Sequence, residues 1–180
     1  MTLCGGLTFR KLAPVEIVTL PSGRQVAIRA IQADDGRRLQ AAYERLSPQT
    51  KYRRFLAVKP RLTDADVAYL TAADGTDHVA LVATTAEDPR RIIAVGRFVR
   101  LADELAVAEL AIVVGDPYQG EGLGTELLWR LRDAALVCGI ERLKATVLAD
   151  NVPVHRLLRH GVVRERHLGV IDEVEVELAA

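Results

Sequence analysis

Three glycines alternate over five residues of the chain, in a segment whose residue types are suited to binding phosphate. Gly120, Gly122 and Gly124 follow an apolar segment that ends at Val114 and precede a run with helical periodicity. A loop that joins a strand to a helix N-terminus presents free backbone N–H groups and the positive end of the helix dipole, and both attract anions. Glycine also lets a ligand approach the backbone closely. The residues alone leave two interpretations open, a phosphate-binding loop or a tight connection that binds nothing.

The spacing of these glycines excludes two well-known nucleotide-binding loops. A Walker A loop ends in Gly-Lys-Ser/Thr, whereas this loop ends in Gly124-Thr125 without a lysine. The dinucleotide-binding fingerprint needs glycines in the pattern G-x-G-x-x-G, and the glycines here are spaced differently. The loop therefore predicts neither a P-loop NTPase nor a Rossmann-type enzyme.

A single acidic residue interrupts the apolar segment before the loop. Glu109 lies among Val107, Leu110, Ile112 and Val114. A carboxylate in a central strand is costly to desolvate unless it is paired or near solvent. A carboxylate beside an amine can accept the proton that the amine must lose before it attacks a carbonyl. The residues alone favour a salt-bridge partner or an exposed strand position over this catalytic role.

The periodicity of apolar residues predicts the elements that position these groups. Alternation predicts strands, and recurrence every three or four residues predicts helices. The predicted strands are 26–30, 78–84, 91–101, 105–114, 143–148 and 173–178, and the predicted helices are 34–46, 48–55, 63–70, 123–138 and 151–158. This order predicts an α+β fold with a mixed sheet, in which three consecutive strands form an antiparallel meander.

Length, composition and charge indicate one globular domain and exclude several classes of protein. The chain has 180 residues, of which 49% are hydrophobic and 27% are charged, so we expect neither a disordered nor a membrane-embedded protein. The formal net charge is zero, whereas nucleic-acid binding usually needs a basic surplus. We therefore expect one domain over residues 1–180, with no nucleic acid and no membrane as partner. Residues 1–22 are either an N-terminal extension or an added strand.

The two cysteines, Cys4 and Cys138, match no metal-ligand spacing and no disulfide framework. The first ten residues lack a basic leader followed by an apolar run, and no apolar stretch approaches the roughly 20 residues of a membrane span. We expect a cytoplasmic protein without a metal.

The glycine loop and its surroundings resemble those of the GNAT acetyltransferase superfamily. Gln119, Gly122 and Gly124 match the superfamily pattern Gln/Arg-x-x-Gly-x-Gly/Ala, between a strand and a long helix. The resemblance covers roughly residues 24–168. It implies a GNAT-like fold and a loop that binds the pyrophosphate of acetyl-CoA. The implied cofactor-binding residues of the loop are Gln119, Gly120, Glu121, Gly122, Leu123, Gly124 and Thr125.

Several segments are similar to the acetyltransferase domain of Pat-type protein lysine acetyltransferases. These segments are 26–29, 46–48, 54–55, 79–83 and 108–114, the last of which leads into 118–120. Pat-type enzymes carry a general-base glutamate at the matching place in this strand. The resemblance therefore implies that Glu109 is the general base. This reverses the interpretation from the residues alone, which favoured a salt-bridge partner or an exposed strand position. In that group the domain is often fused to a cyclic-nucleotide or synthetase-like module, which we do not expect here.

The resemblance also implies cofactor contacts outside the loop. Ile112, Val113 and Val114 match the part of the strand whose backbone binds the pantetheine arm, and Asn151 matches an asparagine that contacts the cofactor. Without the resemblance, these residues have a simpler structural interpretation. Ile112, Val113 and Val114 are buried strand positions, and Asn151 is a helix cap, a place that asparagine favours.

The sequence departs from the common superfamily pattern where the general acid is expected. Many members carry a tyrosine in the helix after the asparagine, which protonates the CoA thiolate, and here Leu158 lies near that place. His155 is close in sequence but is interpreted as a surface histidine. We therefore assign no general acid.

Three other features receive no functional role from the sequence. The arginine pairs Arg53-Arg54 and Arg90-Arg91 are interpreted as solvated surface charge. His78, at the start of a strand on the expected acceptor side, is interpreted as a surface or capping residue.

The sequence predicts an N-acetyltransferase that moves an acetyl group from acetyl-CoA to a primary amine by direct attack in a ternary complex. The Pat-type resemblance favours a protein lysine as the amine. A small-molecule amine, a non-catalytic CoA-binding regulatory module and a cofactor-free interaction domain remain as alternatives. The sequence leaves open whether the chain acts as a monomer or a homodimer.

Overall fold

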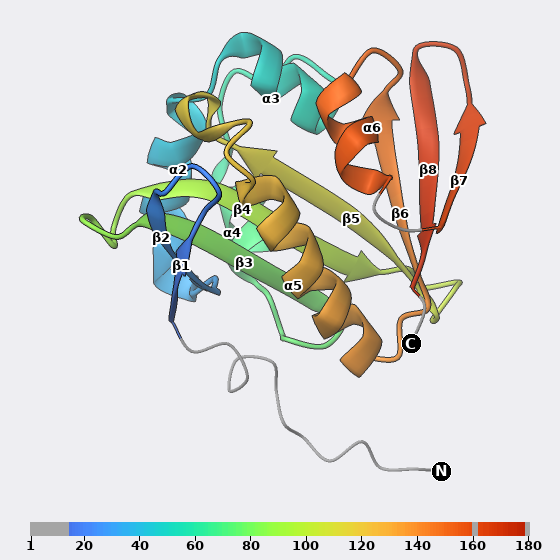
Figure 1. Cartoon of the computed structure of the whole chain (residues 1–180), viewed down its shortest axis with the longest axis horizontal. Coiled ribbons are helices and arrows are strands. Elements are labelled where there is room, and N and C mark those ends of the chain that lie inside the picture. The colour runs from blue at the N-terminus through green and yellow to red at the C-terminus, as the bar shows by residue number, and fades with distance from the viewer. Residues whose placement is uncertain (1–14, 160–161, 179–180) are drawn as a thin grey trace.

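In the computed structural model, which describes residues 15–159 and 162–178, the chain folds around one sheet of eight strands. The strands lie in the order β1-β2-β3-β4-β5-β6-β8-β7 (Figure 1). Their bounds are β1 Glu16–Thr19, β2 Gln25–Ala30, β3 His78–Thr85, β4 Ile92–Arg100, β5 Val107–Val114, β6 Arg142–Leu148, β7 Val162–His167 and β8 Ile171–Glu177. Every neighbouring pair is antiparallel except β5 and β6, which are parallel. The predicted mixed sheet with an antiparallel meander is confirmed.

Helices cover both faces of this sheet. Their bounds are η1 Ala33–Asp35, α2 Gly36–Glu44, α3 Pro48–Phe55, α4 Asp64–Thr71, η2 Asp116–Tyr118, α5 Leu123–Val137 and α6 Val152–Leu158, where η marks a 3-10 helix. Figure 1 shows α5 crossing one face, with α2 and α4 behind the sheet and α3 at its upper end. None of the described helices has the length and apolar character needed to cross a membrane.

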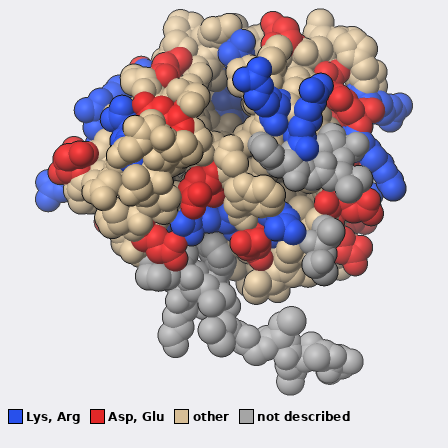
Figure 2. Space-filling model, viewed as in Figure 1, with Lys and Arg blue, Asp and Glu red and all other residues tan. Residues whose placement is uncertain are grey.

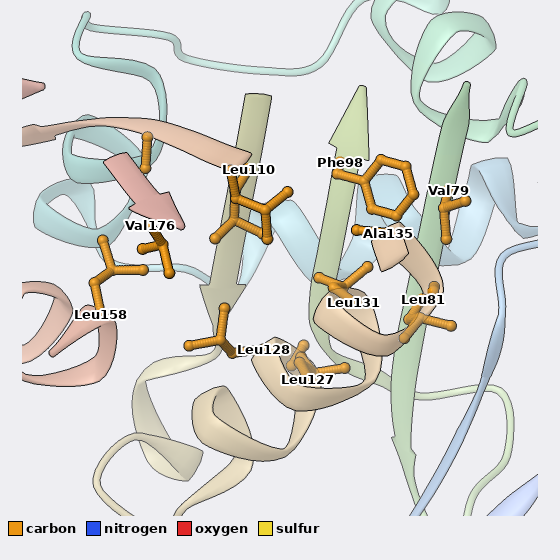
Figure 3. Packing of buried hydrophobic residues seen from close by; sticks show 14 of the residues in the cluster. Val79, Leu81, Phe98, Leu110, Leu127, Leu128, Leu131, Ala135, Leu158 and Val176 are labelled. Carbon is orange, nitrogen blue, oxygen red and sulfur yellow. The ribbon is translucent and has the colours of Figure 1, made fainter. Parts of the chain in front are cut away.

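Two hydrophobic clusters hold these layers to the sheet. Leu81 and Phe98 pack with Leu131 of α5 on one face (Figure 3). Val82 and Val95, from the same strands β3 and β4, pack with residues of α2 and α4 on the other face. Consecutive side chains of a strand point to opposite faces, so the central strands are buried on both sides. This explains why their sequences are almost continuously apolar.

Asp35 joins the helix α2 to the strand β2. Its buried carboxylate accepts hydrogen bonds from Arg29 at 2.6 and 2.8 Å, from Arg38 at 2.7 Å and from the backbone N–H of Gln32 at 2.9 Å. Burial opposes ionisation of this carboxylate, but the hydrogen bonds outweigh it and lower the pKa of Asp35 to about 2. Asp35 is therefore ionised at neutral pH and links β2, η1 and α2.

The structure adds two strands to the predicted set. β7 was not predicted, because residues 164–167 are polar or charged and exposed, so they show no apolar alternation. A strand at the edge of a sheet can keep both faces in solvent, and β7 is the last strand of this one. The N-terminal segment 1–22 contributes β1, which pairs with β2, and residues 1–14 of that segment lie outside the described residues.

We predict that Asp35→Asn destabilises the protein by about 3 kcal/mol near neutral pH, because it leaves the charge of Arg29 largely buried without its partner. The pKa of Asp35 is lower in the folded chain than in the unfolded chain. The contribution of the ionised Asp35 to the free energy of unfolding is therefore complete above about pH 4 and is lost as the pH falls toward about 2. Denaturant unfolding of both proteins across this range measures the difference in free energy.

Asp34→Asn is the matched control, because the Asp34 side chain is 70% exposed and an exposed ion pair contributes little. The free-energy gap between wild type and Asp35→Asn is expected to shrink below about pH 4. A gap that stays constant with pH would contradict the role assigned to the ionised carboxylate.

Candidate active site

The sheet opens in its middle, between β5 and β6. These parallel strands pair over only three residues of each, Val107–Glu109 with Arg142–Lys144. β5 nevertheless continues to Val114 and β6 to Leu148. Figure 1 shows the two strands diverging from their shared start, β5 toward α3 and β6 past α6. Figure 2 shows a hollow in the upper part of the same face, with Lys and Arg side chains beside it.

Backbone groups of alternate β5 residues point into this opening. The N–H of Gly115 donates to the C=O of Ile93 at 2.8 Å, and the pairing of β4 with β5 runs without a register shift. Because the polar backbone groups of neighbouring residues point to opposite sides of a strand, those of Val113 also face β4. Those of Ile112 and Val114 face the opening. Of the three predicted pantetheine positions, two therefore present their backbone to a ligand there.

Glu109 is the last paired residue of β5 before the opening. Its side chain is exposed and lies with Lys144 on the wall of a cavity of about 360 Å³ beside β6 and β8. Arg54 of α3 is near enough that the charge of Glu109 counteracts the lowering of the Arg54 pKa by burial. The desolvation problem raised by an acidic residue in a central strand is solved by the opening, which leaves this carboxylate accessible.

The glycine loop is held from both sides by side-chain contacts. Asp116 accepts hydrogen bonds from the backbone N–H and Oγ of Ser47, at 2.9 and 2.6 Å, and from Thr50 Oγ1 at 2.8 Å. These bonds fix the start of the loop to the N-terminus of α3. Glu121 forms an ion pair with Arg24, with an Oε2 to Nε distance of 2.7 Å, at the turn between β1 and β2. The conformation of the loop is therefore set by the protein itself.

Gln119 supports the loop with its side chain. Its Nε2 donates to the C=O of Val114 at 3.0 Å and to Thr50 Oγ1 at 3.3 Å. These contacts join the end of β5 to the loop and to α3. In this arrangement the side chain of Gln119 positions the loop backbone.

The loop leads into a helix N-terminus that no side chain caps. Gly120 and Gly122 have φ values of +77° and +93°, in the left-handed region that favours glycine. Gly122 is the N-cap residue of α5, and α5 has no side-chain capping hydrogen bond. The N–H groups of Leu123, Gly124 and Thr125 belong to the first turn, which lacks intrahelical partners. With the helix dipole, these groups can bind the negative charges of a pyrophosphate.

Asn151 lies at the start of α6 and is 5% exposed. It is the N-cap residue of α6, as the residues alone indicated, but its side chain makes no capping hydrogen bond to this helix. Nearby, the ring of His155 lies between two carboxylates, with Nδ1 2.8 Å from Glu165 of β7 and Nε2 3.4 Å from Asp172 of β8. His155 is therefore tied to the β7–β8 pair, and Leu158 of the same helix is buried and apolar.

His78 is buried, so its interpretation as a surface residue is wrong. Its Nε2 lies 3.1 Å from Nη1 of Arg97, and because arginine can only donate, Nε2 is the acceptor. Burial and the charge of Arg97 lower the pKa of His78. The ring stacks on Tyr69 with a centroid distance of 5.5 Å. His78 is a neutral residue that orients Arg97, and cross-strand pairing, which single-residue patterns do not reveal, brings the two together.

Comparison with known proteins agrees with this geometry. The family model described as Acetyltransferase (GNAT) family matches residues 39–162. The acetyltransferase Pat of Mycolicibacterium smegmatis is 37% identical over 167 residues, which are 91% of this chain and 48% of that protein. The acetyltransferase PA5475 of Pseudomonas aeruginosa is 31% identical over 136 residues, 75% of this chain and 73% of that protein. The chain thus spans about half the length of the Pat protein.

Solved structures show the same fold. The GNAT domain of S. lividans PAT has a TM-score of 0.83 and 31% identity, covering 91% of this chain and 97% of that one. The cAMP-binding acyltransferase from Mycobacterium smegmatis has a TM-score of 0.68 and 29% identity, covering 94% and 49%. The Salmonella typhimurium protein yncA, solved with its cofactor acetyl-CoA, has a TM-score of 0.68 and 20% identity, covering 86% and 94%, which shows likeness of fold alone.

We predict that Gly122→Ala destabilises the protein more than Gly120→Ala does. Both substitutions place a side chain at a positive φ, which costs about 1 kcal/mol. A Cβ at residue 122 would also lie 2.9 Å from Pro21 Cδ, whereas one at residue 120 meets nothing within 4 Å. We expect a loss of about 1 kcal/mol for Gly120→Ala and at least about 2 kcal/mol for Gly122→Ala.

Gly124→Ala is the control for these two substitutions. Its Cβ would make only ordinary contacts, at 3.6 Å from Leu157 and 3.8 Å from Val114, within a helix that favours alanine. Denaturant unfolding of the three variants measures the order. Equal losses for Gly120→Ala and Gly122→Ala would show that Pro21 does not constrain the loop.

Proposed function

The chain belongs to the acetyltransferase (GNAT) family of acetyl-CoA-dependent N-acetyltransferases, and from this premise we propose that it acetylates the side-chain amine of protein lysines. The observation that carries the proposal is the opening between β5 and β6, which has an exposed carboxylate at its apex and an uncapped helix N-terminus at its far end. The 37% identity with the acetyltransferase Pat supports a Pat-type acceptor.

The residues around the opening fit acetyl-CoA in three places. The backbone N–H groups at Gly120–Thr125 suit its pyrophosphate, since they combine left-handed glycines with the uncapped start of α5. The outward-facing backbone of Ile112 and Val114 suits the amides of its pantetheine arm. Asn151, at the start of α6, is the third proposed contact, because its place after β6 matches that of the cofactor-binding asparagine in the superfamily. Bound acetyl-CoA supplies the activated thioester.

Glu109 acts as the general base in this proposal. A lysine amine has a pKa of about 10.4 and is protonated at neutral pH, so it must lose a proton before it can attack. Glu109 accepts this proton, directly or through a water molecule. The neutral amine then attacks the thioester carbonyl, so that a C–N bond forms and the C–S bond breaks. CoA leaves as a thiolate in the same ternary complex.

Protonation of the CoA thiolate is assigned to solvent. At the place of the usual tyrosine the chain has the buried, apolar Leu158, which has no proton to donate. His155 is held by Glu165 and Asp172 of the neighbouring strands. The opening itself is accessible to water, as the exposure of Glu109 shows.

Two alternative functions would use this same site, and measurements of acetyl transfer distinguish them from the proposed one. A non-catalytic CoA-binding module would bind acetyl-CoA without turnover on any amine, and the accessible Glu109 favours the enzyme. An acetyltransferase for a small-molecule amine would use the same base and loop. A comparison of kcat/KM between lysine peptides and small amines distinguishes it from the protein lysine acetyltransferase.

We predict that Glu109→Gln lowers kcat by at least about 100-fold, because the amide cannot accept the proton from the acceptor. Affinity for acetyl-CoA should stay within about threefold, since the loop and the β5 backbone are unchanged. Calorimetry measures the affinity, and a coupled thiol assay measures turnover. Glu141→Gln, at an exposed position just before β6, is the control and should keep the wild-type rate. A wild-type rate in Glu109→Gln would remove Glu109 from the mechanism.

A further inference from the structure

A second cavity lies on the face of the sheet opposite α5, between the sheet and the helices α2, α3 and α4. Its volume is about 100 Å³, and residues such as Leu39, Phe55 and Val95 make its wall mostly apolar. Ala111 of β5 also lines it. Ala111 is two residues from Glu109 and shares its face of the strand, so the two side chains are about 7 Å apart along β5. The cavity therefore extends toward the carboxylate proposed as the general base.

The charged residues of this cavity are all of one sign. Of the described residues that line it, Arg45, Arg54, Arg91 and Arg97 are basic, and none is Asp or Glu. Arg45 and Arg91 lie at exposed positions, whereas Arg54 and Arg97 lie deeper. A wall of apolar side chains with several guanidinium groups and no acid is complementary to a small anion.

Arg97 is the most deeply buried of the four, with 4% exposure. Its guanidinium donates to Nε2 of His78 at 3.1 Å and to the C=O of Leu70 at 3.2 Å. Both acceptors are neutral, and no carboxylate of the described residues pairs with it. Burial and the neighbouring charge of Arg54 lower the pKa of Arg97 to about 10. Arg97 therefore stays protonated at neutral pH as a buried cation without a counter-ion, which is an unfavourable state that a bound anion relieves.

Arg54 connects the cavity with the opening. It lies in the last turn of α3, with its guanidinium 4.9 Å from the ring centroid of Phe55. It is attracted by Glu109 and repelled by Arg97. An anion held between Arg54 and Arg97 would satisfy both guanidinium groups and lie on the same side of the sheet as Glu109. The interpretation of Arg54 as solvated surface charge is wrong.

We propose that this cavity binds a carboxylate of the acceptor, so that the preferred substrate is an amine with a carboxylate nearby. The inference rests on the proposed function and specifies its acceptor, a lysine with an acidic side chain beside it. A volume of about 100 Å³ equals the share of about three water molecules, which is room for a carboxylate and its methylene group. Arginine suits this group because its planar guanidinium can bind both carboxylate oxygens.

Two pairs of acceptors test the proposal and identify the source of the carboxylate. The first pair is a lysine peptide with Glu or Gln next to the lysine, and the second is 4-aminobutyrate and its amide. We expect the charged member of the peptide pair to have at least about tenfold higher kcat/KM in the wild type. A preference confined to the small-molecule pair would support the carboxylate site but assign it to a free amine. Equal kcat/KM within both pairs would overturn the proposal.

Variants of the cavity separate recognition from catalysis. The quantity compared is the kcat/KM for the charged acceptor divided by the kcat/KM for its neutral partner. In Arg97→Gln this ratio should fall at least about tenfold, and Arg97→Lys should keep part of the preference. The ratio is taken within each variant, so a general loss of activity cancels. Arg53→Gln, next to Arg54 but outside the cavity lining, is the matched control and should keep the wild-type ratio. An unchanged ratio in a folded Arg97→Gln protein would overturn the proposal.

Glutarate binding gives a measurement that needs neither a variant nor turnover. Calorimetry should show saturable binding of this dicarboxylate to the wild-type protein, and glutarate should compete with the Glu-containing peptide. No saturable binding would overturn the carboxylate site. If glutarate binds but no amine of either pair is acetylated, the proposed function fails while the anion site stands.

Discussion

The structure depends on the early separation of β5 from β6. Pairing that stops after Glu109 leaves the backbone of Ile112 and Val114 without strand partners in the middle of a sheet, where unpaired polar groups are costly. Gln119 satisfies only the C=O of Val114. The same separation exposes Glu109, which a continuous sheet would bury. One departure from regular pairing therefore creates both the surface proposed for the cofactor and the access proposed for the acceptor. The uncapped start of α5 lies at the end of this opening and completes it.

The contacts around the opening couple its two sides. Asp116 and Gln119 bond to the first turn of α3. The last turn of the same helix carries Arg54, which is attracted by Glu109 and lines the cavity that contains Arg97. The loop proposed for the pyrophosphate and the cavity proposed for the acceptor are thus attached to opposite ends of one short helix. Asp35 fixes the start of α2 to β2 and so holds the other wall of that cavity. An arrangement that fixes both sites to one helix fits the proposed direct transfer between two bound substrates.

Local patterns in the sequence predicted the helices, the strands and the loop. They did not predict contacts between residues that are far apart in the sequence. The glycine spacing and the apolar periodicities are properties of neighbouring residues, and the mixed sheet and α5 were predicted from them. The family was predicted from the resemblance of the loop and its surroundings to the GNAT pattern. The environment of Arg97 depends on the register that places β4 between β3 and β5, so neither its burial nor that of His78 could be predicted. The alternation that turns Val113 away from the opening likewise needs the register of β4. The roles of Glu109 and Asn151, the cytoplasmic location and the absence of a metal stay predictions, and the choice between a monomer and a homodimer stays open.

The most direct test of the account is a titration of the isotope-labelled protein with acetyl-CoA, followed by the backbone amide resonances. If the opening and the start of α5 hold the cofactor, the amides of Ile112, Val114 and residues 120–125 will show the largest saturable shifts. ATP, which lacks the pantetheine arm, will leave Ile112 and Val114 nearly unchanged. Saturable shifts confined to another surface, or no saturable binding of acetyl-CoA, would contradict the central claim that the gap between β5 and β6 is the acetyl-CoA site.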